Sequence, residues 1–169
     1  MGRHNNQEAN KERIAALYDE HADAIHRYCF FRIYNEAKAE ELMQDAFLKM
    51  WRYLEEGKNV ENERALLYVI ATHLIIDDKR KVREERLDDI LENEEAPHPA
   101  SSYDPSSRAR LREVREEVSR LSPEEQNLFA LRYVSDLDPK DIAEIMGTSA
   151  NVISVQLNRI ISKIRGKLV

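Results

Sequence analysis

The amino-acid sequence predicts an all-α fold made of two small helical domains. The chain has 169 residues, a length that allows one ordinary domain or two small ones. Only 4 residues are glycine and 7% are aromatic, while alanine, leucine, glutamate, arginine and lysine are abundant. These abundant residues favour helices, whereas strands draw on β-branched and aromatic side chains. Apolar residues that recur at helical spacing lead to the same prediction.

The first predicted helix runs from about Lys11 to Arg32. It is amphipathic, because its apolar residues recur three, four or seven positions apart. A turn at Tyr34 and Asn35 is expected to end it. The side chains expected to point inward are Ile14, Leu17, Tyr18, Ile25, Tyr28 and Cys29.

The second predicted helix has two contrasting faces and stops near Gly57. Its inward stripe consists of Leu42, Met43, Ala46, Phe47, Met50, Trp51 and Leu54. The opposite side is charged around one apolar residue and consists of Glu40, Glu41, Gln44, Asp45, Leu48 and Arg52. A face of this composition is most simply a solvated surface, so these residues alone do not indicate a partner.

A polar loop from Glu56 to Glu63 leads to a third predicted helix, which begins at about Arg64. The side chains expected to point inward are Leu67, Ile70 and Leu74. The helix runs into a basic cluster of Lys79, Arg80, Lys81 and Arg83. Three helices of this kind form a compact bundle.

The net charge of −6 is concentrated in one segment. Residues 1–86 carry a net charge of −2 and residues 108–169 carry +2, whereas residues 87–107 carry −6 and contain no lysine or arginine. That segment also holds three of the five prolines and has no sustained helical period. The sequence therefore predicts a flexible acidic linker over 87–107, between domains at 10–86 and 108–169.

The C-terminal domain shows clear helix start and stop signals. The sequence from Ser122 to Glu125 is a capping box with proline at the first helical position, and Asp138 followed by Pro139 repeats the start signal. A short helix then ends at Gly147, and Thr148 and Ser149 precede another helix. The inward residues of this last helix are Ile153, Leu157, Ile160, Ile164 and Leu168. The pattern is a helix-turn-helix.

The outward face of the last helix is suited to DNA. A helical wheel points Asn151, Val155, Asn158, Arg159 and Ser162 outward, and no acidic residue follows Glu144. Asparagine side chains suit adenine edges and basic side chains suit phosphates, so the helix could lie in a major groove. Helix-turn-helix units also occur in purely structural roles, and spacing alone leaves that alternative open.

The residue pattern predicts neither an enzyme nor a metal site. His21 and His26 are five positions apart and do not share a helix face, and the single Cys29 excludes an internal disulfide. No nucleophile or phosphate-cradling loop accompanies the acidic pairs Asp77-Asp78 and Glu84-Glu85. No cofactor is expected. The absence of a long apolar run and of a signal-peptide pattern predicts a cytoplasmic protein.

The sequence resembles the small two-domain sigma factors of the extracytoplasmic function (ECF) group over almost its whole length, from about Ile14 to Leu168. The segments LYDEHADAIHRY, AEELMQDAFLKMW and RALLYVIATHLIIDDKRK resemble region two of that family. The segment from Leu121 to Leu168 resembles its region four. Two separate blocks in this order, with an acidic linker between them, make the resemblance specific.

This resemblance implies a factor that binds core RNA polymerase, through the clamp coiled coil and the flap, and directs it to promoter DNA. An anti-sigma factor is a further implied partner. The residues implied to bind polymerase are Glu40, Glu41, Gln44, Asp45, Leu48, Trp51 and Arg52. Those implied to melt and read the −10 element are Lys58, Asn59, Asn62, Arg64, Tyr68, Thr72, His73, Lys79, Arg80 and Lys81. Those implied to read the −35 element are Ser149, Asn151, Ser154, Val155, Asn158, Arg159 and Lys163.

The chain departs from the family pattern on these same surfaces. Leu66 to Val69 replace the usual Trp-Leu-Tyr-Arg, and His73 stands where relatives often have asparagine. Ser154 and Gln156 replace basic residues that relatives commonly carry in the recognition helix, which removes two phosphate contacts. Two alternatives remain: a sigma-like decoy that binds an anti-sigma factor without reading DNA, and a stand-alone helix-turn-helix regulator or nucleic-acid enzyme.

Overall fold

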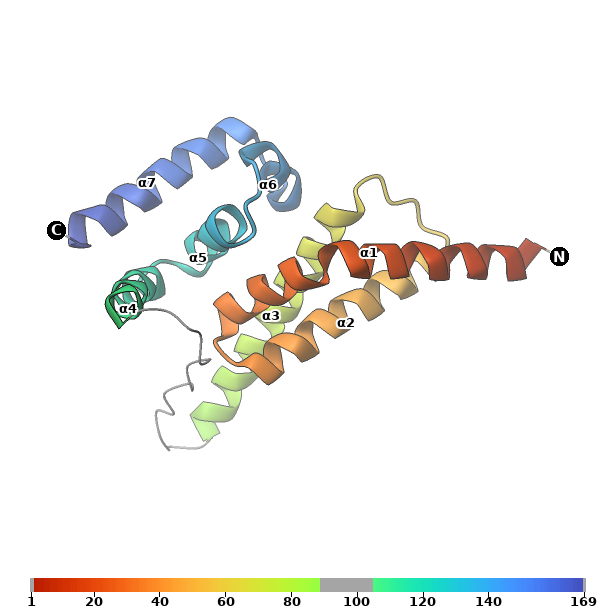
Figure 1. Cartoon of the computed structure of the whole chain (residues 1–169), viewed down its shortest axis with the longest axis horizontal. Coiled ribbons are helices and arrows are strands. Elements are labelled where there is room, and N and C mark those ends of the chain that lie inside the picture. Colours follow the sequence, from red (N-terminus) through yellow and green to blue (C-terminus); the bar gives the residue numbers. More distant parts are fainter. Residues whose placement is uncertain (1, 89–104, 169) are drawn as a thin grey trace. The chain divides into compact units, whose positions relative to one another are not determined.

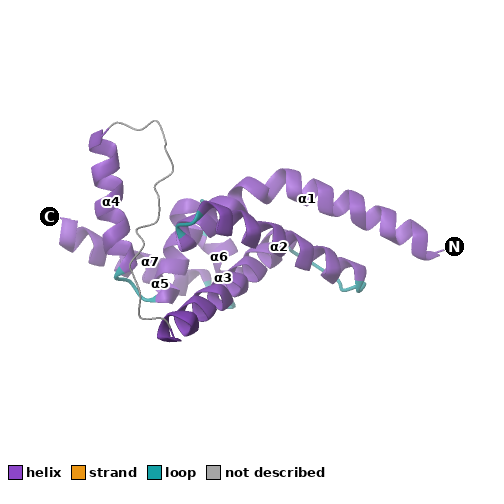
Figure 2. Cartoon of the chain, turned by 90° about the horizontal axis from the view of Figure 1, so that it is seen from below, coloured by secondary structure: helices purple, strands orange, loops and turns teal. Residues whose placement is uncertain are grey.

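The computed structural model describes residues 2–88 and 105–168, and every regular element in this part of the chain is a helix (Figures 1 and 2). The all-α prediction is confirmed. The chain divides into two compact units, residues 1–96 (unit 1) and 97–169 (unit 2). Among the described helices, none is both long enough and apolar enough to cross a membrane.

Unit 1 is a bundle of three helices, α1 (Gly2–Ile33), α2 (Glu36–Glu55) and α3 (Glu63–Asp88), each packed against the other two. Helix α1 begins well before the predicted start at Lys11. The Asn10 amide nitrogen lies 3.3 Å from the Leu54 carbonyl oxygen, and Arg13 pairs with Glu63. These contacts are polar, and residues 2–10 contain no apolar stripe. Apolar periodicity therefore could not predict the first turns of α1.

The predicted turn between α1 and α2 is confirmed. Tyr34 adopts the left-handed conformation with φ 57°, and its ring lies 5.9 Å from the Phe31 ring. Asn35 then caps α2, because its side-chain oxygen accepts a 2.9 Å hydrogen bond from the Lys38 backbone N–H. The left-handed Tyr34 and the cap from Asn35 to Lys38 together lie within five consecutive residues, so the sequence alone could predict this turn.

The core of unit 1 contains the predicted apolar stripe of α2, with Trp51 half-buried at its edge. In α1 the prediction was wrong for Tyr18, which is 42% exposed although its ring contacts Phe47 at 4.9 Å. Ile14 is half-buried, and the deeper α1 positions are buried as predicted. The buried residues of unit 1 are Leu17, Ile25, Tyr28, Cys29, Arg32, Ala39, Leu42, Met43, Ala46, Phe47, Met50, Leu54, Ala65, Leu67, Tyr68, Ala71 and Ile75.

The inward face of α3 differs from the prediction. Leu67 is buried as expected, but Ile70 and Leu74 are only half-buried, and the stripe continues through Ala71 and Ile75 instead. The segment from residue 66 to 76 is apolar on almost every side of the helix. Its pattern therefore could not indicate which face would meet the other two helices.

Unit 2 consists of α4 (Pro105–Ser119), α5 (Pro123–Phe129), the π-helical turn η1 (Ala130–Val134), α6 (Pro139–Met146) and α7 (Ala150–Leu168). Helix α4 was not predicted, and it includes residues 105–107 of the expected linker. Residues 87–88, at the other end of that segment, belong to α3. The rest of the linker prediction, over 89–104, lies outside the described residues.

The caps of unit 2 follow the sequence signals with one exception. The Ser122 capping box is complete, with both reciprocal bonds at 3.2 Å, and Gly147 ends α6 in the left-handed conformation at φ 67°. Asp138 has the extended backbone of a cap, but its side chain makes no capping hydrogen bond and its carboxylate lies 3.5 Å from an Arg132 nitrogen. Here an ion pair replaces the predicted cap.

Helices α6 and α7 form the predicted helix-turn-helix. Ile153, Leu157, Ile160 and Ile164 of α7 are buried as predicted, and Ile142 of α6 is fully buried. The Leu168 side chain lies outside the described part. This packing leaves the opposite face of α7 exposed to solvent.

Candidate interaction surfaces

The outer face of α2 is a charged surface with an apolar centre. We define the α2 face as Glu40, Glu41, Gln44, Asp45, Leu48 and Arg52. Leu48 is 49% exposed, and Glu41 lies two turns before it on the same side of the helix. The α2 face lies opposite the buried stripe because both follow from one helical period.

Neighbouring side chains hold parts of the α2 face in place. The Gln44 amide nitrogen lies 3.2 Å from a Glu40 carboxylate oxygen, and the Lys38 ammonium lies 3.0 Å from a Glu41 oxygen and 3.2 Å from an Asp78 oxygen. Asp45 is half-buried and the other members are exposed. An exposed leucine ringed by carboxylates suits a basic partner that also offers an apolar contact.

Three residues of the polar loop between α2 and α3 were predicted to contact DNA: Lys58, Asn59 and Asn62. Two of them make contacts within unit 1. The Asn62 side-chain oxygen accepts a 2.9 Å hydrogen bond from the Ala65 backbone N–H and so caps α3. The Lys58 ammonium lies 2.5 Å from a Glu56 oxygen and 4.5 Å from the centre of the Tyr53 ring. Asn59 is exposed on the loop. Asn59 is therefore the better placed of the two asparagines to meet a partner.

On α3 the prediction that Tyr68 faces a DNA strand was wrong. Tyr68 is only 2% exposed, and its ring packs edge-on against the Tyr28 ring with 5.4 Å between centroids. Thr72 is half-buried: its hydroxyl donates to the Tyr68 carbonyl at 2.7 Å and lies 2.8 Å from the Tyr28 hydroxyl. Burial raises the pKa of Tyr28 to about 12. Arg64 and His73 are exposed.

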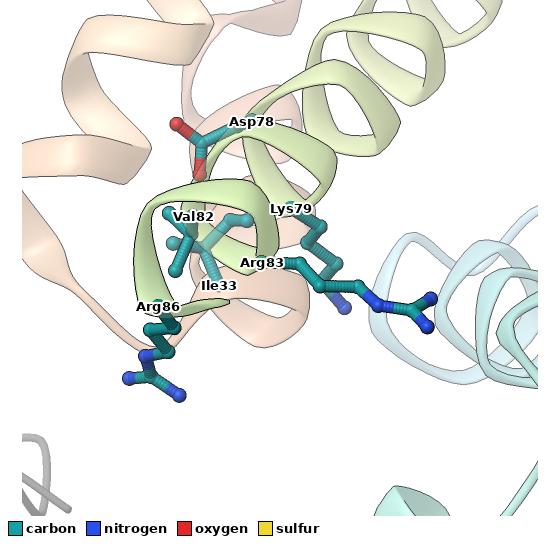
Figure 3. A pocket seen from close by; sticks show the side chains of 6 residues that line it. All are labelled: Ile33, Asp78, Lys79, Val82, Arg83 and Arg86. Carbon is teal, nitrogen blue, oxygen red and sulfur yellow. The ribbon is translucent and has the colours of Figure 1, made fainter. Parts of the chain in front are cut away.

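The basic end of α3 surrounds a pocket of about 450 Å³ (Figure 3). Lys79 is half-buried there, and burial together with the Arg32 guanidinium lowers the pKa of Lys79 to about 8. Arg80 and Lys81 are exposed, and an Arg80 nitrogen lies 3.4 Å from an Asp77 oxygen. The pocket is lined by Ile33, Asp78, Lys79, Val82, Arg83 and Arg86.

The outer face of α7 carries the residues predicted to point outward. Asn151, Val155, Asn158 and Arg159 are exposed. Two predicted residues have local structural roles, since Ser149 caps α7 through the Val152 N–H at 3.3 Å and the half-buried Ser154 donates to the Ala150 carbonyl at 2.9 Å. A shallow groove of about 480 Å³ is lined by Val155, Asn158, Arg159, Ser162 and Lys163.

Lys163 has a partner that the sequence did not indicate. It forms an ion pair with Glu125, the same residue that closes the capping box of α5. Lys163 lowers the pKa of the Glu125 carboxyl. The two residues are 38 positions apart, so no local pattern could have linked them.

No group of three or more histidine, cysteine, aspartate or glutamate side chains within the described residues is arranged to hold a metal ion. Cys29 is fully buried, and burial raises the pKa of its thiol to about 12. His26 lies 3.2 Å from a Glu36 carboxylate oxygen and His21 lies 3.8 Å from a Glu20 oxygen. Cys29 and these histidines are thus part of the packing and surface of the bundle.

Comparison with known sequences gives one family match for each unit. Residues 17–85 match the model of sigma-70 region 2, and residues 111–164 match the model of sigma-70 region 4. RNA polymerase sigma factor YlaC of Bacillus subtilis is 28% identical over 155 residues, which cover 89% of this chain and 88% of YlaC. ECF RNA polymerase sigma factor SigL of Mycobacterium tuberculosis is 24% identical over 153 residues, which cover 90% of this chain and 86% of SigL.

Two solved structures share the fold. One is the sigma factor RpoE in complex with the anti-sigma factor NepR from Bartonella quintana, with a TM-score of 0.71 and 21% identity over 91% of this chain and 95% of RpoE. The other is CnrH in complex with the cytosolic domain of CnrY, with a TM-score of 0.70 and 16% identity over 98% of this chain and 94% of CnrH. At these identities the similarity concerns the fold alone.

Proposed function

This chain belongs to the extracytoplasmic function group of sigma-70 family sigma factors, and we propose that its α2 face binds core RNA polymerase while α3 and α7 contact the promoter. The observation that carries the polymerase assignment is the exposed Leu48 among carboxylates. Carboxylates around an apolar centre complement a basic coiled coil such as that of the polymerase clamp, because charge sets the orientation and apolar burial contributes affinity.

The direct test is assembly followed by transcription. The purified full chain should comigrate with core RNA polymerase in gel filtration and support run-off transcription from a matching promoter. Failure to bind core polymerase would overturn the proposal. Binding to an anti-sigma factor with no transcription from any promoter would favour the sigma-like decoy instead.

We propose that the loop after α2 and the outer side of α3 contact the −10 element. Asn59, Arg64 and His73 are exposed there, and Arg80 and Lys81 extend the same helix with positive charge. A preformed loop that holds an unstacked base offsets the few kcal/mol that unstacking costs. Tyr68 takes no part in this surface, because it lies in the core.

The two loop asparagines should behave differently on substitution. Asn59→Ala should change the preferred −10 base with little effect on stability, because its side chain is exposed on the loop. Asn62→Ala should destabilise the fold by about 1 kcal/mol through the lost cap of α3. Permanganate footprints on promoters that vary at single −10 positions, together with urea denaturation, measure both effects. An unchanged base preference in Asn59→Ala would remove this residue from the reading surface.

We propose that α7 reads the −35 element through Asn151 and Asn158, with Arg159 on phosphate. These side chains share one exposed face, and α7 carries no acidic residue. Asn158→Ala should lose about 1–3 kcal/mol of discrimination at one base pair, the usual value of a bidentate base contact. Fluorescence anisotropy of the holoenzyme against a −35 promoter panel measures it. If Asn158→Ala weakens binding equally for every −35 sequence, Asn158 contacts the DNA backbone rather than a base.

Glu125 is proposed to compete with DNA phosphate for Lys163. Glu125→Gln should tighten −35 binding several-fold and steepen the salt dependence by up to about one unit, because Lys163 then becomes available to phosphate. Glutamine also serves in a capping box, so α5 should keep its start. Glu124→Gln is the matched control, with the same charge change on the adjacent exposed residue. Equal effects of the two variants, measured at several salt concentrations, would show that only net charge matters.

An anti-sigma factor is a further proposed partner. The similar structure of RpoE was solved with the anti-sigma factor NepR, and region 2 and region 4 are both present in this chain. We also place the protein in the cytoplasm, because core polymerase and promoter DNA are its proposed partners. Co-purification of the tagged chain from its native cells, followed by mass spectrometry, tests for a bound anti-sigma factor.

A further inference from the structure

The pocket at the basic end of α3 combines one amine with two guanidinium groups. Lys79, Arg83 and Arg86 lie four and three residues apart, so their backbone positions share one side of the helix. Ile33 from the end of α1 and Val82 add apolar surface to the same pocket. Figure 3 shows Lys79 and Arg83 extending to one side of α3, whereas Asp78 and Arg86 extend away from them.

The surroundings of Lys79 favour the neutral amine. Burial is the main cause of its lowered pKa of about 8, the buried Arg32 guanidinium adds to it, and Asp78 opposes it. The Asp78 carboxylate also forms an ion pair with the Lys38 ammonium, at 3.2 Å. Asp78 therefore does not stabilise the charged form of Lys79 alone. Near pH 8 about half of the Lys79 side chains are thus uncharged, whereas a lysine of ordinary pKa is almost fully protonated.

The arginine beside this amine is suited to a phosphate group. A guanidinium presents paired N–H donors that match two phosphate oxygens, and it stays charged at every physiological pH. Arg83 is exposed, lines the same pocket as Lys79 and extends to the same side of α3 (Figure 3). A desolvated lysine next to cationic groups is also the kind of lysine that acts as a nucleophile.

We propose that Lys79 is an acylation site whose donor is a small acyl phosphate, held by Arg83. The lone pair of the Lys79 Nζ attacks the acyl carbonyl carbon. The bond from that carbon to the phosphate oxygen breaks, and inorganic phosphate leaves with the electron pair. The amine proton passes to solvent and an amide remains on Lys79. The pocket's apolar side chains accommodate the short acyl chain.

The modification would remove positive charge next to Arg80 and Lys81, which are assigned above to the −10 element, and this consequence rests on the proposed function. Loss of one phosphate contact reduces the salt dependence of DNA binding by about one unit. The acylation reaction itself requires neither polymerase nor DNA. Its failure can therefore be distinguished from failure of the proposed function.

The test is peptide mapping by mass spectrometry after incubation of the full chain with acetyl phosphate between pH 7 and 9. Lys79 should react several-fold faster than the exposed Lys49 and Lys140, because Arg83 holds the donor beside it and its own amine is about half neutral near pH 8. The Lys79 rate should level off just above pH 8. Equal rates at the three lysines would overturn the proposal.

A variant of Arg83 tests its role in binding the donor. Arg83→Gln should slow acylation of Lys79 by acetyl phosphate several-fold and leave its reaction with the uncharged donor p-nitrophenyl acetate nearly unchanged. Arg86→Gln is the matched control with the same charge change, and it should slow acylation much less because Arg86 extends away from Lys79. Equal slowing of Arg83→Gln with both donors, or equal slowing in Arg83→Gln and Arg86→Gln, would overturn phosphate binding by Arg83. Faster reaction of the parent chain with acetyl-CoA than with acetyl phosphate would overturn the choice of donor. Circular dichroism checks that each variant keeps its helices.

Discussion

Reversing two charges on the α2 face should nearly abolish binding to core RNA polymerase. In Glu41→Arg combined with Asp45→Arg, like charges would oppose a basic docking site, at a cost of several kcal/mol. That cost corresponds to a loss of affinity of about 100-fold or more. Competition with labelled parent chain for core polymerase measures the loss. The fold should survive, because Glu41 is exposed and its contact with Lys38 contributes only a few tenths of a kcal/mol.

The matched control makes the same charge change elsewhere on unit 1. Glu12→Arg with Asp19→Arg places two arginines on the exposed side of α1, seven residues apart. This control should bind core polymerase like the parent chain. If both double variants lose affinity equally, overall charge rather than the α2 face governs binding. If neither loses affinity, polymerase binds another surface.

Replacing Tyr68 should unfold much of unit 1 rather than weaken DNA contacts. Tyr68 is almost fully buried and packs against Tyr28. Tyr68→Ala should therefore lower the free energy of unfolding by about 3–5 kcal/mol, as for other large aromatic side chains in cores. Urea denaturation followed by Trp51 fluorescence measures this loss, because Trp51 is the single tryptophan of the chain and lies in α2.

Ile76→Ala is the control for this measurement, because Ile76 is on the same helix but 51% exposed. It should change the free energy of unfolding by no more than about 0.5 kcal/mol. A stable Tyr68→Ala protein with weakened −10 binding would restore the role that the sequence had suggested for this residue. If Tyr68→Ala and Ile76→Ala lower the free energy of unfolding equally, any truncation of an apolar side chain on α3 destabilises unit 1, and the burial of Tyr68 is not the cause.

Features that depend on a few neighbouring residues could be predicted from the sequence. The Ser122 capping box, the Gly147 stop and the turn at Tyr34 and Asn35 each involve groups within about four positions. The buried stripe and the exposed face of α2 follow from one helical period in the same way. The two sigma-70 regions were also recognisable, because they consist of such local patterns in a fixed order.

Only tertiary contacts decided the rest. The apolar segment of α3 offers several equivalent faces, and packing against α1 and α2 selected the one that buries Tyr68. Lys79 owes its lowered pKa to burial and to Arg32 on another helix, and Lys163 pairs with Glu125 across unit 2. Such properties depend on which distant groups the fold brings within a few ångströms. Burial and Coulomb interaction act over that spatial distance, which spacing along the chain does not give.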